Sequence, residues 1–159
     1  MEFIPYQRLT ITTDLSREEV VSRMKERVGP TKRDNFVRVD KNIFSGRLGN
    51  DRFELRLIKN YRNSWTPEVT GTITGKDDTT ELIVTLKSNI FAIVFTAVFI
   101  LIGLSMLVYQ IVDFSDFGSF DWMTLLFILF PYGLCWFGFN LDADKSIDGL
   151  IKITKGAIK

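Results

Sequence analysis

The chain has 159 residues, of which 25% are charged, with a formal net charge of +1 and no histidine. Because Cys135 is the single cysteine, disulfides within the chain are excluded, and because histidine is absent as well, so are zinc sites built on Cys and His, Ser-His-Asp triads and Cys-His dyads. We therefore predict no catalytic residue, no metal site and no cofactor, and we expect no enzymatic activity.

Charged residues are sorted into blocks along the chain. Residues 1–89 contain 16 Lys and Arg and 13 Asp and Glu, a net charge of +3. Between Lys87 and Asp142 the only charged residues are three aspartates, all within residues 113–121. The basic residues of the first block alternate with acids, so no nucleic-acid partner is expected. This sorting predicts a soluble domain followed by membrane segments.

The first predicted elements are a strand and a helix. Residues 6–13 alternate apolar and polar side chains, with the period of two of a half-buried strand. Ser16 and Glu19 have the spacing of a capping box, which predicts the start of a helix, and a Gly-Pro pair predicts its end at Val28. The apolar stripe of this helix predicts that it lies on a sheet.

A succession of short alternating segments follows, separated by turns rich in Gly, Asn and Asp. The pattern predicts an antiparallel meander with one solvated face. Residues 1–89 would then form a soluble α+β domain, which we expect to fold by itself. Glu54 and Arg56 share one face of a strand and predict an exposed ion pair. The predicted strands cover residues 36–39, 43–48, 52–61, 68–74 and 79–86.

A polar and aromatic link between two of these strands is the candidate partner-binding site. In one interpretation, its Asn and Ser bond the local backbone while its Trp and Pro cover the edge of the core. In the other, its Arg, Tyr and Trp form a recognition loop, because these residues are common in binding hot spots. The candidate residues are Tyr61, Arg62, Asn63, Ser64, Trp65 and Pro67.

About thirty residues in this region resemble small two-span bacterial membrane proteins of unknown function. The resemblance implies a bacterial membrane protein with two spans, and it implies no catalytic or binding residue. The motifs that carry it are Phe44-x-Gly46, Phe53-Glu54-Leu55-Arg56-Leu57 and Tyr61-Arg62-Asn63-Ser64-x-x-Pro67-x-x-x-Gly71.

Two long uncharged segments predict a transmembrane hairpin. Residues 90–112 would form a helix of roughly 34 Å, against a hydrocarbon core of about 30 Å. Residues 122–141 are also uncharged, with Trp122 at one end, where aromatic rings favour the membrane interface. Pro131 lies in the middle of this second segment and predicts a kink. We therefore expect two transmembrane helices.

The charges beside these segments predict their orientation. The connecting loop, residues 113–121, contains no Lys or Arg, whereas Lys87 precedes the first segment and several lysines follow the second. The positive-inside rule then predicts an external acidic loop and both termini in the cytoplasm. The first residues lack the pattern of a secretory signal, which agrees with this orientation. We predict a location in the bacterial cytoplasmic membrane, also called the inner membrane.

The tail, residues 142–159, is predicted to be cytoplasmic and amphipathic. Residues 144–155 place apolar side chains at helical spacing and predict a short separate helix. Its apolar stripe has two possible partners, the membrane interface or the sheet of the soluble domain. We favour the junction between the membrane interface and the domain, because the segment begins within a few residues of the bilayer.

These features favour a membrane-anchored, non-enzymatic binding or accessory subunit of a larger assembly. Its expected partners are the lipid bilayer and other membrane subunits or further copies of the chain. One alternative is a membrane-perturbing effector that forms a pore or leak. Another is a lipid-binding domain, because the predicted order of elements resembles the helix-grip arrangement of START-like proteins. The polar residues available to line a pore are Thr96, Ser105, Gln110, Thr124, Tyr132 and Asn140.

Overall fold

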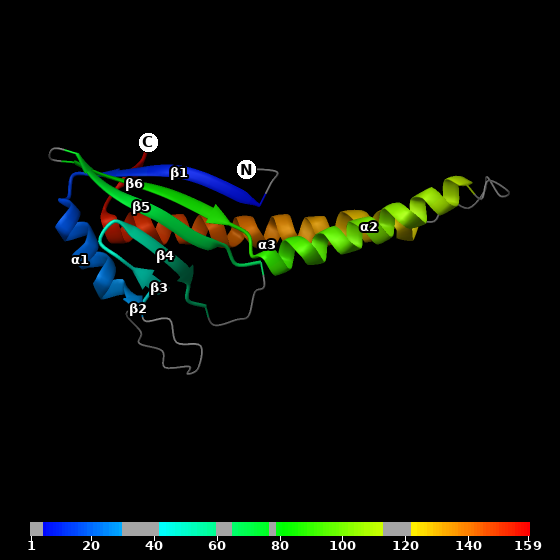
Figure 1. The fold of residues 1–159 in the computed structure, drawn as a ribbon, viewed down its shortest axis with the longest axis horizontal. Helices are drawn as coiled ribbons and strands as arrows, with labels where there is room; N and C mark the ends of the chain where they lie inside the picture. Colours follow the sequence, from blue (N-terminus) through cyan, green and yellow to red (C-terminus); the bar gives the residue numbers. More distant parts are fainter. Residues whose placement is uncertain (1–4, 30–41, 60–64, 77–78, 113–121) are drawn as a thin grey trace.

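The computed structural model describes residues 5–29, 42–59, 65–76, 79–112 and 122–159. In this part of the chain the protein is α+β, with a seven-stranded mixed sheet and three helices, two of them long and apolar. The long helices run side by side away from the sheet. The molecule therefore has a sheet domain at one end and, at the other, a helical stalk formed by residues 90–112 and 122–141 (Figure 1).

The sheet has the strand order β2-β3-β4-β5-β6-β1-β7. Strands β3 to β6 form the predicted antiparallel meander, and β1 pairs antiparallel with β6. The sheet is not wholly antiparallel, because β2 pairs parallel with β3 directly after the first helix. The predicted strand 36–39 lies outside the described residues. The strands are β1 (Tyr6–Thr13), β2 (Val28–Gly29), β3 (Phe44–Leu48), β4 (Arg52–Leu57), β5 (Glu68–Lys76), β6 (Thr79–Lys87) and β7 (Ala157–Ile158).

Helix α1 (Arg17–Arg27) begins at the predicted capping box. The Ser16 hydroxyl accepts a hydrogen bond from the Glu19 backbone N–H at 3.3 Å, and the Glu19 carboxylate accepts one from the Ser16 N–H at 3.2 Å. These bonds satisfy donors that the first turn of a helix leaves open. Val20 and Met24 on the apolar face of α1 are fully buried, so α1 lies against the sheet as predicted.

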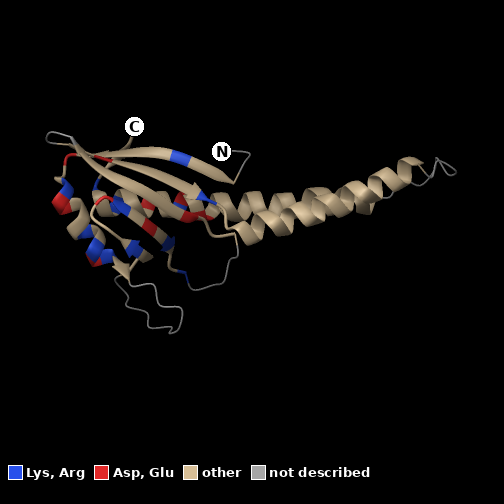
Figure 2. Ribbon diagram, in the orientation of Figure 1, with Lys and Arg blue, Asp and Glu red and all other residues tan. Residues whose placement is uncertain are grey.

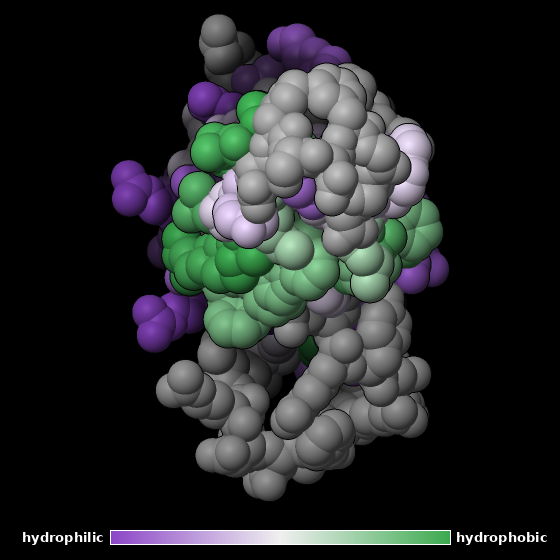
Figure 3. Space-filling model, turned by 90° about the vertical axis from the view of Figure 1, so that its right-hand side faces the viewer, coloured by the Kyte–Doolittle hydropathy of each residue, from purple (hydrophilic) through white to green (hydrophobic). Residues whose placement is uncertain are grey.

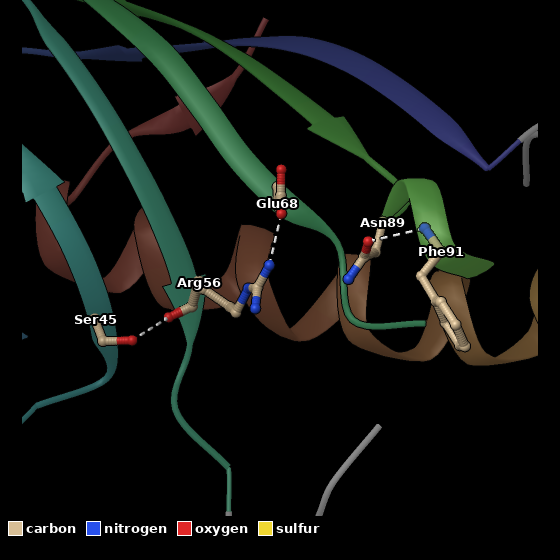
Figure 4. A network of polar contacts seen from close by, with 5 residues as sticks. All are labelled: Ser45, Arg56, Glu68, Asn89 and Phe91. Carbon is tan, nitrogen blue, oxygen red and sulfur yellow. Dashed lines mark hydrogen bonds and ion pairs between the residues drawn. The ribbon is translucent and has the colours of Figure 1, made fainter. Parts of the chain in front are cut away.

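Helix α2 (Ile90–Val112) starts directly after β6. The Asn89 side-chain oxygen accepts a hydrogen bond from the Phe91 backbone N–H at 3.0 Å, which caps the helix where it leaves the sheet (Figure 4). Farther along, α2 packs closely on α3. A Cβ added at Gly103 would lie 2.5 Å from Ile128 Cγ1, so glycine allows the two helices to approach there.

Helix α3 (Trp122–Thr154) is one continuous helix of 33 residues that passes through Pro131. The separate short helix predicted for residues 144–155 is therefore wrong: this segment is the last part of α3. Its apolar stripe is buried against the sheet domain, not left for a membrane surface. The physical reason is that residues 142–144 contain no Gly or Pro to end the helix, and the stripe continues without a break from Phe139.

The hydrophobic core lies between the sheet and the helices that cover one of its faces, α1 and the second half of α3 (Figure 1). Phe44, Leu82 and Leu86 from the sheet are fully buried in it. The core thus extends beyond residues 1–89. The outer face of the central strands carries no helix and is lined by exposed or half-buried side chains, which include Thr10, Thr70, Thr72, Ile83 and Thr85. Part of α3 contributes five core residues, Phe139, Ala143, Ile147, Leu150 and Ile153.

Candidate functional site at the junction of sheet and stalk

Asp142 marks the point where α3 passes from its apolar segment into the sheet domain. It is the first charged residue after the uncharged run of residues 122–141. Its side chain is completely buried. Because burial of an isolated carboxylate is very costly, this position requires a partner. The partner comes from the chain segment that follows β4.

Lys59 forms an ion pair with Asp142 and is itself only 7% exposed. Thr66, which precedes β5, joins the pair. The Lys59 ammonium donates a hydrogen bond to the Thr66 hydroxyl at 3.1 Å, and that hydroxyl donates to Asp142 Oδ2 at 3.2 Å. We call these three residues the junction triad. It connects both ends of the segment between β4 and β5 to α3.

The junction triad is suited to positioning more than to chemistry. Its three side chains are between 0% and 8% exposed, so solvent and dissolved substrates do not reach its polar atoms. A buried ion pair adds little net stability compared with apolar packing, but removal of one partner leaves an uncompensated charge. Such a pair fixes one arrangement of the elements that contribute to it. Here it fixes the sheet against the helix that enters the stalk.

Trp65 adds an apolar contact beside the triad. A Cβ added at Gly138 would lie 3.1 Å from the Trp65 Cβ and 3.4 Å from its Cγ. Glycine at this position therefore allows Trp65 to pack closely on the helix. Gly133, one and a half turns earlier, has no atom within 4 Å of the same added Cβ. Of these two glycines, only Gly138 has a close neighbour, which is Trp65.

The candidate partner-binding residues are only partly described. Tyr61, Arg62, Asn63 and Ser64 lie outside the described residues. Trp65 is half-buried on α3 and Pro67 is buried, so the described end of this link packs on the protein itself. That arrangement agrees with the first of the two interpretations for these two residues. Whether the link also binds a partner stays a prediction.

Sequence reasoning missed all three members of the triad. Thr66 and Asp142 are 76 residues apart, and no periodic pattern connects them. One signal was available: Asp142 is the first charge after a long apolar run, at a position where its helix continues. A buried carboxylate at the end of a span is a recognised mark of a specific partner.

The exposed ion pair expected between Glu54 and Arg56 is not the pair that forms. Arg56 instead bonds Glu68 at 2.6 Å (Figure 4). Arg56 and Glu68 are directly opposite each other on β4 and β5, which brings their side chains closer than positions two apart on one strand. Both are about half exposed, so this pair belongs to the solvated face of the sheet. Asp51 pairs with Arg17 at the start of α1.

The stalk presents an apolar surface. Figure 2 shows that the described part of the stalk has no charged residue, whereas the sheet domain carries both signs. Seen from the free end of the stalk, hydrophobic side chains surround the helix pair and hydrophilic ones lie farther out (Figure 3). Only 17% of the most apolar stretch of α2 and 22% of that of α3 are buried. A core helix of a soluble protein would be mostly buried, so these two helices have the length, composition and exposure of membrane spans.

Several polar side chains of the stalk are occupied by bonds within it. Gln110 donates to the Thr124 hydroxyl at 2.6 Å and so joins the two helices. Ser105 and Asn140 donate to backbone oxygens of their own helices, at 2.7 and 2.8 Å. Thr96 is buried, and its hydroxyl has no hydrogen-bond partner among the described residues. At least four of the six residues considered as pore lining thus make hydrogen bonds inside one chain.

The described residues contain no group of three or more Cys, Asp or Glu placed to hold a metal ion. No family model matches the chain, and no curated protein or solved structure is significantly similar to it. The fold and the junction triad are therefore the observations on which a functional proposal can be built.

Proposed function

We propose that the chain is a membrane-anchored, non-enzymatic binding or accessory subunit of a larger assembly in the bacterial cytoplasmic membrane. The observation that carries this proposal is the continuity of α3, which is exposed and apolar in its first part and belongs to the core of the sheet domain in its last part. One helix thus serves as anchor and as structural element of the domain.

The junction triad supports this proposal, because it holds the sheet domain at a defined position on the stalk. A domain on a flexible linker reaches many positions, whereas a domain fixed to a span presents the same surface at the same height above the bilayer. Such a fixed surface suits a constant partner in the same membrane. Among the described residues, no helix covers the outer face of the central strands, so this face is available for such a partner (Figure 1).

Orientation follows from charge. Lys87 lies directly before α2, and Lys145 and Lys152 follow the apolar part of α3, whereas the connecting loop has three aspartates and no Lys or Arg. By the positive-inside rule, this distribution of charge supports a cytoplasmic sheet domain.

The two alternatives have less support. A pore built from several hairpins needs free polar groups along its lining, and Ser105, Gln110, Thr124 and Asn140 are engaged inside one chain. A helix-grip lipid binder needs a cavity between sheet and helix, and there Phe139 and Leu150 of α3 are fully buried against the sheet. Both arrangements favour a module that binds through its surface.

Co-purification tests the proposal. The tagged chain, cross-linked in native membranes and solubilised in mild detergent, should bring down the same membrane proteins, or further copies of itself, in repeated preparations. Asp142→Asn, which disturbs the junction triad, should reduce that recovery at equal expression, whereas Asp148→Asn at an exposed position of the same helix should not. Recovery of the uncomplexed chain alone would contradict the proposal.

A further inference from the structure

A basic groove lies at the end of the sheet domain that is farthest from the stalk. It has a volume of 480 Å³ and opens between the last turns of α1 and α3. Four cations from these two helix ends line it, together with one acid, Glu26. Ile43 and Ile153 form its apolar wall. The cations are Arg23, Arg27, Lys152 and Lys155.

Helix dipoles account for only part of this charge. Cations in the last turn of a helix offset the partial negative charge of its open carbonyls, and Arg27 and Lys152 occupy such positions. Arg23 lies one turn earlier, and Lys155 lies beyond the end of α3. The fold nevertheless brings all four side chains to one hollow. The described lining of the groove carries four cations and one acid, and this excess of positive charge attracts anions.

Lys155 has a backbone conformation that is unusual for lysine. Its φ is 51°, and it is the only residue other than glycine with positive φ among those described. Gly156 follows, where a Cβ would lie 2.5 Å from Ile11 Cγ2 and 2.7 Å from the Thr12 carbonyl oxygen. Glycine is therefore needed at position 156 for close packing on β1. The left-handed backbone conformation that ends the helix is adopted by Lys155, the residue before this glycine. Asn or Gly suits that position better, yet a long cation occupies it at the mouth of the groove.

We propose that this groove binds a soluble nucleotide, a ligand with several phosphate charges and an apolar ring. Arginine side chains bind phosphate oxygens in pairs, and lysines add point charges. The half-buried Ile43 offers the ring an apolar contact, and the volume falls in the range of small-ligand pockets, about 300 to 1,000 Å³.

A lipid headgroup is a less suitable ligand than a dissolved one. In the membrane orientation proposed above, the groove lies roughly 20 Å along α3 from the end of its apolar segment. That distance exceeds two Debye lengths at physiological salt, each about 8 Å. The groove therefore faces the aqueous side of the protein, where nucleotides are the common polyanions with a ring.

Isothermal titration calorimetry tests this inference on the full chain in detergent micelles, with ATP, GTP and inorganic tripolyphosphate as probes. We expect saturable binding of one nucleotide per chain, at least tenfold tighter than that of tripolyphosphate. Arg23→Gln combined with Lys152→Gln should weaken nucleotide binding at least tenfold. The matched control, Arg47→Gln with Lys145→Gln, removes the same charges from exposed positions outside the groove and should bind as the unaltered chain does.

The melting temperature of each variant, followed by circular dichroism, shows whether it is folded at the temperature of the titration. An Arg23→Gln single variant serves if the double variant is unfolded. Equal weakening in groove and control variants would overturn the inference, because it would mean non-specific attraction to net charge. Absence of nucleotide binding at millimolar concentration, or tripolyphosphate binding as tight as that of the nucleotides, would also overturn it.

Discussion

At the scale of single residues, the ion pair between Lys59 and Asp142 should behave as a positioning contact. Removal of one partner, by Lys59→Met or Asp142→Leu, should cost about 3 to 5 kcal/mol of unfolding free energy, because the other charge stays buried without compensation. The double variant should be more stable than either single variant, since it leaves no buried charge. Chemical denaturation in detergent, followed by tryptophan fluorescence, measures all three.

Arg56→Gln provides the control, because its ion pair with Glu68 is about half exposed. Exposed pairs contribute at most about 1 kcal/mol, so this variant should be close to the unaltered chain. If the single variants at Lys59 and Asp142 were as mild as Arg56→Gln, the burial and pairing described for the junction triad would be wrong.

The glycine beneath Trp65 gives a second prediction at this scale. Gly138→Val should displace the indole and lower stability by about 1 to 3 kcal/mol, the usual cost of overpacking. Gly133→Val makes the same change in the same helix at a position with no neighbour within 4 Å. It should leave stability and the tryptophan emission maximum almost unchanged. A similar response of the two variants would contradict the contact between Trp65 and α3.

Residues of the junction show why local sequence patterns locate elements better than sites. The capping box of Ser16 and Glu19 was predicted correctly, because its two members are three residues apart and their spacing alone defines it. Thr66 and Asp142 are 76 residues apart, so only the fold brings them together. The pairing of Arg56 with Glu68 instead of Glu54 has the same cause, since it depends on the register of β4 with β5.

At the scale of elements, the second half of α3 should be required for the sheet domain to fold. Its four large buried side chains, Phe139, Ile147, Leu150 and Ile153, each stabilise the core by about 1.5 to 3 kcal/mol. Together they contribute roughly 6 to 12 kcal/mol, comparable with the whole stability of a typical domain, about 5 to 15 kcal/mol. A fragment of residues 1–89 should therefore lack a cooperative thermal transition, contrary to the expectation from the sequence.

A fusion of two segments makes this test specific. Residues 1–89 joined through a flexible linker to residues 139–159 keep the core stripe of α3 and the strand β7, and they omit the apolar part of the stalk. This fusion should melt cooperatively by circular dichroism. Cooperative melting of residues 1–89 alone would show that the α3 stripe is dispensable.

The same helix shows the limits of reading elements from composition. The uncharged run stops at Leu141, and the change of composition there suggested the end of a helix. Composition indicates whether a helix lies in an apolar or a polar environment. It does not indicate where the helix ends, because an end requires a residue such as Gly or Pro that breaks the helix. Strands β2 and β7 were missed for another reason: each has two residues, too few to show an alternating pattern. Longer strands and α1 were predicted because their periodicity extends over several turns or pleats.

At the scale of the whole molecule, the order of elements was predictable, and their connection was not. A charged domain, two apolar helices and an amphipathic tail were all evident from the distribution of charged and apolar residues. The return of α3 into the domain depends on contacts among distant parts of the chain. This return makes stalk and domain one structural unit, which supports the proposed role as a fixed binding subunit.

The central claim is that α2 and α3 cross the membrane with the sheet domain in the cytoplasm. Single cysteines at Ser119, in the connecting loop, and at Lys145, on the exposed side of α3, test it in a Cys135→Ala background. Intact cells treated with a membrane-impermeant maleimide should be labelled at position 119 alone, and permeabilised cells at both positions. Labelling of intact cells at position 145 but not at 119 would contradict the orientation, and recovery of the protein in the soluble fraction would contradict the membrane location itself.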